Sequence, residues 1–490
     1  MDRMSATDAG FFFAEGENTP LHVGSVAVFD GPAPSYGDLV RLLMSKLPLV
    51  PRYRQRVRSM PLHLGRPLWV DDEHFQILYH VRHTAVPKPG GAEQLRNLAG
   101  RVLGQRLDMA KPLWEVWLVE GLEHGRWALI SKVHHCMVDG IAGTDLMQLI
   151  FDTEPTAEPP EPSVWTPRSH PSAVWMAAQI VQDVLAHPVS QLVSLPFTLL
   201  SAPLEVLRRA AAAGSGFAGV ARQALVPAAR SLGGPIGPHR RWAWGDTTLA
   251  EVKQVRKSLG GTVNDVVLTA ITRGVRDLLD GRGELTDRLV VRSMVPISVR
   301  RSDERGSLNN QVSAVFVDLP VGEPDPVQRL ESLRRQMNQY KRVMDALDAR
   351  AIMGAADFVA PTLMALGTRA AMRTGQPWAQ TVTTNVPGPP VPLYVLGKQM
   401  RSLYPYVPIA MGLRVSIGIF SYTGSITFGI NADFDAFPDI DVLSRGICRG
   451  MDELLEIAGR TPTPLPTAAT TPSASTSDSA SAVEASHATP

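Results

Sequence analysis

Residues 126–150 constrain the fold more than any other part of the chain. Residues 127–133 are mostly apolar and β-prone and follow a glycine, which predicts a buried strand. Apolar residues then recur at near-helical spacing over 141–150, which predicts a helix. His134 and His135 fall where the strand ends. We therefore expect a strand–turn–helix unit that holds two imidazoles by the backbone on both sides.

Asp139 and Gly140 follow the two histidines and complete the pattern HHxxxDG. Histidine can take and return a proton near neutral pH, so this pattern suits general base catalysis. We assign His135 as the base and count His134 and Gly140 with it as catalytic residues. An aspartate at a helix start more often caps N–H groups or pairs with a cation, so we interpret Asp139 as a structural support. A purely structural histidine pair is the alternative.

Composition excludes several classes of function. The length of 490 residues suffices for two or more domains. A formal net charge of +1 gives no reason to expect a nucleic acid partner. The two cysteines cannot form a disulfide framework and favour a reducing compartment, and the N-terminus lacks the apolar segment of a secretory signal. Since no further ligand cluster stands near the histidines at metal-site spacing, we expect no metal.

Changes in composition divide the chain. Six prolines mark 153–171, and an alanine- and leucine-rich stretch follows to about 232. Residues 184–204 lack charged side chains and are about long enough to span a bilayer, but three prolines favour helical pieces on a protein or membrane surface. We predict a first lobe at 1–152, a linker with crossover helices at 153–239, a second lobe at 240–460 and a disordered tail at 461–490.

Periodicity predicts most of the regular elements. Strands are expected at 21–29, 69–72, 77–83, 112–120, 289–300, 314–319 and 425–431, and helices at 36–50, 93–107, 249–259, 262–281, 326–346 and 437–458. Strand 112–120 should form a hairpin with the strand that carries the histidines. Arg52, Arg54 and Arg56 alternate and predict a positively charged strand edge.

Two further motifs stand out. The predicted hairpin places Pro112, Leu113 and Trp114 beside the histidines, where they could shape a substrate channel, pack in the core, or do both. Asn264 lies on the first turn of helix 262–281, and its amide could donate to a developing oxyanion. Asp265 has the spacing of a helix cap, which alone could account for it.

The histidine motif at 134–140 is similar to that of the CoA-dependent acyltransferase superfamily, which includes chloramphenicol acetyltransferase and peptide-synthetase condensation domains. Pro112-Leu113-Trp114 and Asn264-Asp265 resemble the PLW and ND motifs of the bacterial wax ester synthase/diacylglycerol acyltransferase family. The resemblance extends from about residue 1 to residue 458. It implies an α/β fold of two chloramphenicol-acetyltransferase-like lobes, with mixed sheets flanked by helices and an active-site tunnel between them.

The resemblance also implies roles for particular residues. The Asn264-Asp265 pair should lie near the active site and contact substrate, as should Pro112-Leu113-Trp114. In the wider superfamily an arginine pairs with the motif aspartate, which we transfer to Arg300 and Asp139, with Arg292 and Arg301 as rivals.

The implied reaction moves a long-chain acyl group from acyl-CoA to diacylglycerol or a long-chain alcohol, which gives triacylglycerol or wax ester and free CoA. We expect no cofactor, and a cytoplasmic protein bound peripherally to a membrane or lipid droplet. A condensation-type enzyme that uses a carrier-protein thioester, a non-catalytic lipid-binding protein and a metal-dependent hydrolase are the alternatives.

Overall fold

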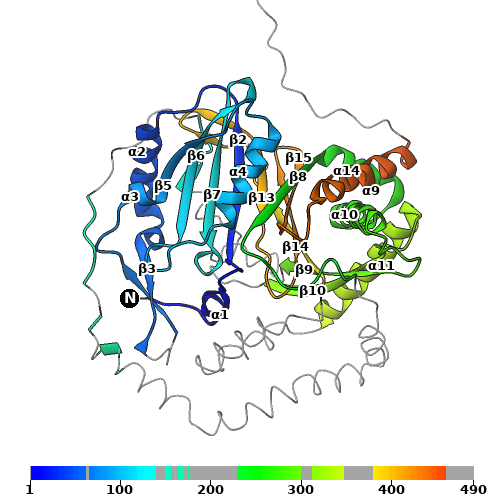
Figure 1. Ribbon diagram of the computed structural model, residues 1–490, viewed down its shortest axis with the longest axis horizontal. Coiled ribbons are helices and arrows are strands. Elements are labelled where there is room, and N and C mark those ends of the chain that lie inside the picture. The colour runs from blue at the N-terminus through cyan, green and yellow to red at the C-terminus, as the bar shows by residue number, and fades with distance from the viewer. Residues whose placement is uncertain are drawn as a thin grey trace, which may run out of the picture.

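The structure is a computed structural model that describes residues 2–61, 66–138, 149–155, 229–298, 312–346 and 379–459, with short pieces between 161 and 178. These residues form two lobes, each built on a six-stranded mixed sheet with helices packed against it (Figure 1). The fold class expected from the sequence is therefore confirmed.

The first lobe carries the histidine motif near the middle of its sheet. Its strand order is β12 (Tyr394–Val395), β13 (Lys398–Tyr406), β2 (His22–Phe29), β7 (Arg126–His134), β6 (Trp114–Leu122) and β5 (Val81–Ala85). Its helices are α1 (Ala6–Ala14), α2 (Tyr36–Lys46), α3 (Ile77–His80) and α4 (Ala92–Gly104). A small sheet of β1 (Asp2–Arg3), β4 (Leu68–Asp71) and β3 (Gln55–Arg58) lies at the N-terminus.

The second lobe has the strand order β10 (Val312–Leu319), β9 (Val291–Ser298), β11 (Thr381–Pro387), β14 (Val415–Tyr422), β15 (Ser425–Asp433) and β8 (Arg240–Thr248). Its helices are α9 (Leu249–Leu259), α10 (Val263–Gly281), α11 (Pro326–Ala346) and α14 (Ile440–Ile457). Helices α10 and α14 lie side by side against this sheet, at the right of Figure 1.

Strands β12 and β13 come from the C-terminal half of the chain but belong to the first sheet. β13 runs antiparallel to β2, with Tyr404 opposite Val26. Residues 394–406 therefore cross from the second lobe to the first, within the stretch 240–460 that we predicted as one lobe. The crossing ties the two lobes together, because two strands of the first sheet lie in the chain between strands β11 and β14 of the second.

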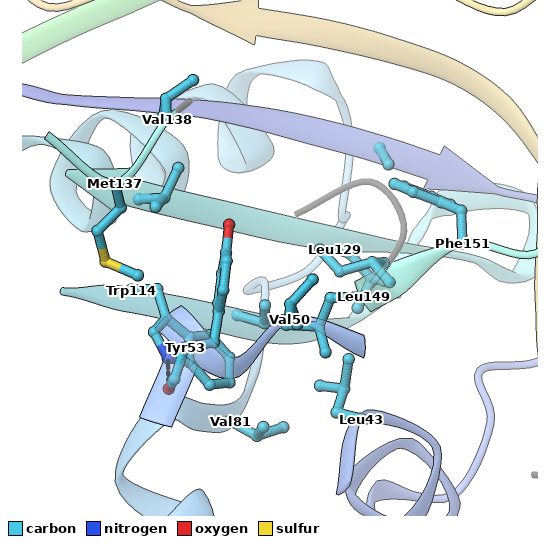
Figure 2. Close-up of a cluster of buried hydrophobic side chains, with 14 of the residues drawn as sticks. Leu43, Val50, Tyr53, Val81, Trp114, Leu129, Met137, Val138, Leu149 and Phe151 are labelled. Atoms are coloured by element: carbon cyan, nitrogen blue, oxygen red, sulfur yellow. Dashed lines mark hydrogen bonds between the residues drawn. The ribbon is translucent and has the colours of Figure 1, made fainter. Parts of the chain in front are cut away.

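The core of the first lobe lies between the sheet and α2, and it extends to the histidine turn. Trp114 and Tyr53 fill its centre, and Met137 and Val138 from the motif pack beside them (Figure 2). The Trp114 side chain is fully buried and its Nε1 donates to the Tyr53 carbonyl at 2.8 Å. The motif is thus anchored in the core by its own apolar residues.

Most predicted elements are confirmed, and helix 249–259 matches α9 at both ends. Two predictions are wrong. Residues 77–80 form a helical turn before β5 begins, and the His80 Nδ1 fixes this turn by donating to the Trp114 carbonyl at 2.8 Å. Residues 51–54 form a 3-10 turn, which Pro51 suits through its fixed φ, so the three arginines do not alternate along one strand.

Several predictions fall outside the described residues. They concern the helix after the motif, the crossover helices with the candidate span 184–204, and the tail 461–490. Among the helices that the structure describes, we find none that is both long and apolar enough to cross a membrane.

Candidate functional site

Backbone hydrogen bonds from two neighbouring strands hold the histidine turn. The His134 amide donates to the Leu113 carbonyl at 2.9 Å, at the start of β6. The His135 amide donates to the Leu21 carbonyl at 2.8 Å, just before β2. The predicted hairpin of β6 and β7 is therefore confirmed, and it places residues 112–114 beside the histidines.

Both ring nitrogens of His134 are engaged. Its side chain is fully buried, and its Nδ1 accepts a hydrogen bond from the Cys136 amide at 3.1 Å. Its Nε2 therefore carries the proton and donates to Glu15 Oε2 at 2.8 Å. Because neither nitrogen is left to accept a substrate proton, His134 acts as a support for the turn.

Glu15 is a member of the site that sequence reasoning missed. The residue follows α1, and its carboxylate also accepts from the Leu21 amide at 3.1 Å and from Arg106 Nε at 3.2 Å. Burial alone would raise the pKa of Glu15, but the hydrogen bonds from His134 and from the Leu21 amide outweigh it and lower the pKa to about 2. Glu15 is therefore an ionised acceptor at neutral pH.

His135 is arranged differently from its neighbour. Its ring stacks on Phe11 of α1, with centroids 3.9 Å apart and an interplanar angle of 23°. Its Nδ1 is buried and, beyond its own backbone, has no hydrogen-bonding partner among the described residues. Burial lowers the pKa of His135 to about 4. The imidazole is therefore neutral at pH 7, the form that can accept a proton.

More ionisable groups lie buried on the neighbouring strands, close to the end of α4. His22 pairs with His134 in the β2–β7 register, and its Nε2 donates to the Leu103 carbonyl. Lys132 Nζ donates to the carbonyls of Val102 and Gln105 at 3.1 and 3.0 Å. These donors bond carbonyls at the C-terminal end of α4 and so link that helix to β2 and β7.

Cys136 follows the two histidines in the turn. Burial raises the pKa of its thiol well above the ordinary value, so the thiol stays protonated at neutral pH. A protonated thiol is a poor nucleophile. Cys136 is therefore a packing residue of the core rather than a site for an acyl-enzyme.

The PLW residues lie in the core. Leu113 and Trp114 have no exposed surface, and the His80 ring stacks on Trp114 with centroids 4.7 Å apart. Their backbone meets His134 through the Leu113 carbonyl. A role for Pro112, Leu113 and Trp114 in shaping a substrate channel stays a prediction, while their role in packing is confirmed.

The ND residues begin α10 in the second lobe. Asp265 Oδ2 accepts from the Thr262 amide at 2.7 Å and the Thr262 side chain accepts from the Asp265 amide at 3.2 Å, so the predicted helix cap is confirmed. Asn264 Oδ1 accepts from Asn385 Nδ2 of β11 at 3.4 Å. Within the described residues, no hydrogen bond joins Asn264 or Asp265 to the histidines.

The predicted Asp139–Arg300 pair, with Gly140 and the rival Arg301, lies outside the described residues. The other rival, Arg292, forms a salt bridge with Asp318 at 2.6 Å. Its guanidinium therefore already has a carboxylate partner in the second lobe.

A cavity of about 540 Å³ borders the histidine turn on the first lobe. Cys136 and Met137 line it together with Asp8, Arg52 and Trp165, so its wall mixes charged and aromatic side chains. The described residues contain no cluster of three or more histidine, cysteine or carboxylate side chains placed to hold a metal ion. The tunnel between the lobes stays a prediction.

Comparison of the sequence with known proteins identifies the family of the chain. The family model of the wax ester synthase/diacylglycerol acyltransferase catalytic domain matches residues 4–267, and the model of the C-terminal domain of the same family matches residues 308–455. Two probable diacylglycerol O-acyltransferases of Mycobacterium tuberculosis are 36% and 28% identical to the chain. The matches cover 94% of this chain in both cases, and 97% and 100% of those proteins.

Solved structures share the fold. The wax ester synthase/diacylglycerol acyltransferase of Marinobacter aquaeolei VT8 superposes with a TM-score of 0.68 at 23% identity, over 94% of this chain and all of that one. A trichothecene 15-O-acetyltransferase of Fusarium sporotrichioides superposes with a TM-score of 0.58 at 12% identity, over 93% of this chain and 94% of that one.

Proposed function

The chain belongs to the wax ester synthase/diacylglycerol acyltransferase family, and on that premise we propose that it moves a long-chain acyl group from acyl-CoA to diacylglycerol, with His135 as general base. The difference between the two histidines carries the proposal. His134 uses both nitrogens within the protein, whereas His135 is neutral and bonded through Nδ1 to no described side chain. Of these two histidines, His135 is therefore the one that can act as the base.

The proposed reaction needs one proton transfer in each direction. His135 removes the proton from the acceptor hydroxyl as the oxygen attacks the acyl carbonyl carbon. The tetrahedral intermediate then collapses, the carbon–sulfur bond breaks, and His135 returns the proton to the departing CoA sulfur. A positioned general base contributes on the order of a hundred- to ten-thousandfold, and alignment of the two substrates contributes much of the rest.

The protein supplies an uncharged base by burying most of its surface. Since its pKa lies near 4, almost all of His135 is ready to accept a proton at neutral pH. A base of low pKa is also weak, which costs driving force for the proton transfer. In this proposal, the orientation of the ring compensates for the weak basicity. No metal or cofactor other than the acyl-CoA substrate takes part in the proposed steps.

Diacylglycerol is the proposed acceptor because the similar mycobacterial proteins carry that activity in their names. A long-chain alcohol is the second candidate acceptor, since the family name covers both ester products. Both acceptors partition into lipid, so we propose that the protein works bound peripherally to a membrane or lipid-droplet surface.

The test is product formation from labelled palmitoyl-CoA with diacylglycerol or hexadecanol supplied in detergent. The proposal expects triacylglycerol, with CoA released in equal amount and only when the acceptor is present. A preference for hexadecanol would make the protein a wax ester synthase. If folded protein forms no ester with either acceptor, the lipid acyltransferase assignment is wrong. Flotation with diacylglycerol-containing vesicles tests the membrane contact separately.

A further inference from the structure

Helix α1 lies against the histidine turn and contacts both imidazoles. Phe11 stacks on His135 and Phe12 meets the His134 ring edge-on, with centroids 6.4 Å apart at 64°. Glu15, directly after the helix, accepts a hydrogen bond from His134 Nε2. One short helix therefore touches the two histidines in two different ways, through stacking at His135 and through hydrogen bonding at His134.

The orientation of an imidazole is usually set by a hydrogen bond to the nitrogen that does not react. His135 lacks such a bond to any described side chain. Beyond the contact of Nδ1 with its own backbone, the described contact that restrains the ring plane is Phe11, because rings stacked at 3.9 Å and 23° permit little rotation of the imidazole. Among the described residues, aromatic stacking therefore takes the orienting role that a hydrogen-bonded carboxylate has in other enzymes.

The helix is itself held in place, which allows it to orient a neighbour. Ser5 caps its first turn by accepting from the Asp8 amide at 3.1 Å. Ala9 and Phe13 are buried in the core of the first lobe. At the other end, Glu15 is bound by the Leu21 amide as well as by His134. Phe11 is thus presented from a helix that is fixed at both ends.

We propose that Phe11 is a positioning residue for acyl transfer, whose ring fixes the plane of the His135 imidazole and keeps water from that face of the base. The inference rests on the proposed function, since it assigns a partner to the proposed base. Phe11 forms no bond to substrate in this account and acts only through His135.

Stacking has two separable consequences. Without the Phe11 ring the imidazole can rotate, so kcat falls while KM for acyl-CoA changes little. Loss of orientation of this kind costs about ten- to a hundredfold. Water can also reach the exposed ring face, which stabilises the charged form and raises the pKa of His135 toward its ordinary value. The acid limb of the rate profile therefore moves to higher pH.

The experiment compares Phe11→Leu with Phe11→Tyr, which keeps the ring, and with Phe12→Leu, which removes the neighbouring ring from the same helix. We expect kcat to fall in Phe11→Leu and to be largely retained in Phe11→Tyr. Between pH 8 and pH 5.5, Phe11→Leu should lose about a further tenfold relative to wild type, as a histidine of ordinary pKa would. The acid limb of Phe12→Leu should stay where it is in wild type.

Thermal unfolding of each variant shows whether it is folded, and Phe11→Met, whose unbranched and flexible side chain adapts to an irregular space, replaces Phe11→Leu if that variant unfolds. An unchanged kcat and an unchanged acid limb in the folded variant would overturn the inference. NMR titration of the His135 ring, assigned with His135→Gln, gives a readout independent of turnover. If His135→Gln keeps full activity, the proposed function fails, whereas a failure of the inference alone leaves His135 essential and Phe11 dispensable.

Discussion

Two regions of this molecule are packed by different chemistry. Around β7, the first lobe buries ionisable side chains such as His134, Glu15 and Lys132, each bonded to a partner. In the second lobe, α10 and α14 meet at Gly274 and Gly446, where the helix backbones approach closely beside Ile447 and Asp277. Burying charge costs free energy unless it is paired, whereas close helix contact does not carry that cost.

The two regions differ in how much of the free-energy cost of burying charge they carry. Around the strand that ends in the histidines, the ionisable side chains are buried, whereas α10 and α14 are joined by ion pairs whose partners keep some exposure, Arg273 with Glu453 and Arg449 with Asp277. We infer that the buried ionisable groups around β7 support the histidine turn, and that the close contact of α10 with α14 makes the second lobe a well-packed support. The predictions below test this division, beginning with the largest expected effect.

Replacing His134 should destabilise the protein most, because it leaves the Glu15 carboxylate buried without its main partner. We expect His134→Leu to lower the free energy of unfolding by about 3 kcal/mol, since Arg106 and the Leu21 amide still contact the carboxylate. Urea unfolding followed by tryptophan fluorescence measures the loss. The double variant with Glu15→Gln should lose less than the sum of the single losses, and strict additivity would argue against the pair.

Glu15→Gln should reduce stability in a way that depends on pH. The folded pKa of Glu15, about 2, lies below its value in the unfolded chain, so its contribution is full above about pH 4.5 and is lost as the pH falls through 2. We expect a loss of about 1.5–3 kcal/mol at pH 7 that shrinks below pH 4.5. Urea unfolding at several pH values gives the curve, and a difference that is constant with pH would contradict it.

Gly274→Ala tests the second lobe. A Cβ at this position would lie 2.7 Å from both the Leu443 carbonyl oxygen and Ile447 Cγ1, so the helices must separate. We expect a loss of about 1–3 kcal/mol with unchanged turnover per folded molecule. Gly281→Ala is the matched control on the same helix, because its Cβ would meet nothing within 4 Å. Equal stability of the two variants would contradict the close packing of α10 on α14.

Thr262→Ala should have the smallest effect. It removes the hydroxyl that accepts from the Asp265 amide and so weakens the start of α10 by about 0.5–2 kcal/mol. Thr262→Ser keeps the hydroxyl and should remain close to wild type in thermal unfolding. A larger loss of activity than of stability in Thr262→Ala would instead favour a substrate role for the turn that carries Asn264 and Asp265.

Local patterns in the sequence predicted much of the fold. Helical spacing and the cap spacing of Asp265 located α10, and β-prone stretches on either side of a turn located the hairpin of β6 and β7. The pairing of β13 with β2 could not be predicted in this way, because the two strands are far apart in the chain and nothing local selects a partner. The turn at 77–80 was missed because a tertiary contact of His80 overrides its β-prone residues.

The site, like the fold, could be predicted only where a local sequence pattern specifies it. The motif identified His134 and His135 by type and spacing, but it could not say which nitrogen of each is engaged. That depends on Glu15, which lies 119 positions before His134 and has no distinguishing local pattern. The stacking of Phe11 on His135 likewise follows only from the position of α1 in the fold.

The most direct test of the account is the acceptor-dependent release of CoA from palmitoyl-CoA by wild type and His135→Gln at equal concentrations of folded protein. The account predicts that the variant keeps the unfolding temperature of wild type and loses about a hundred- to ten-thousandfold in turnover. A His135→Gln variant that is folded and turns over at the wild-type rate would contradict the assignment of His135 as the base.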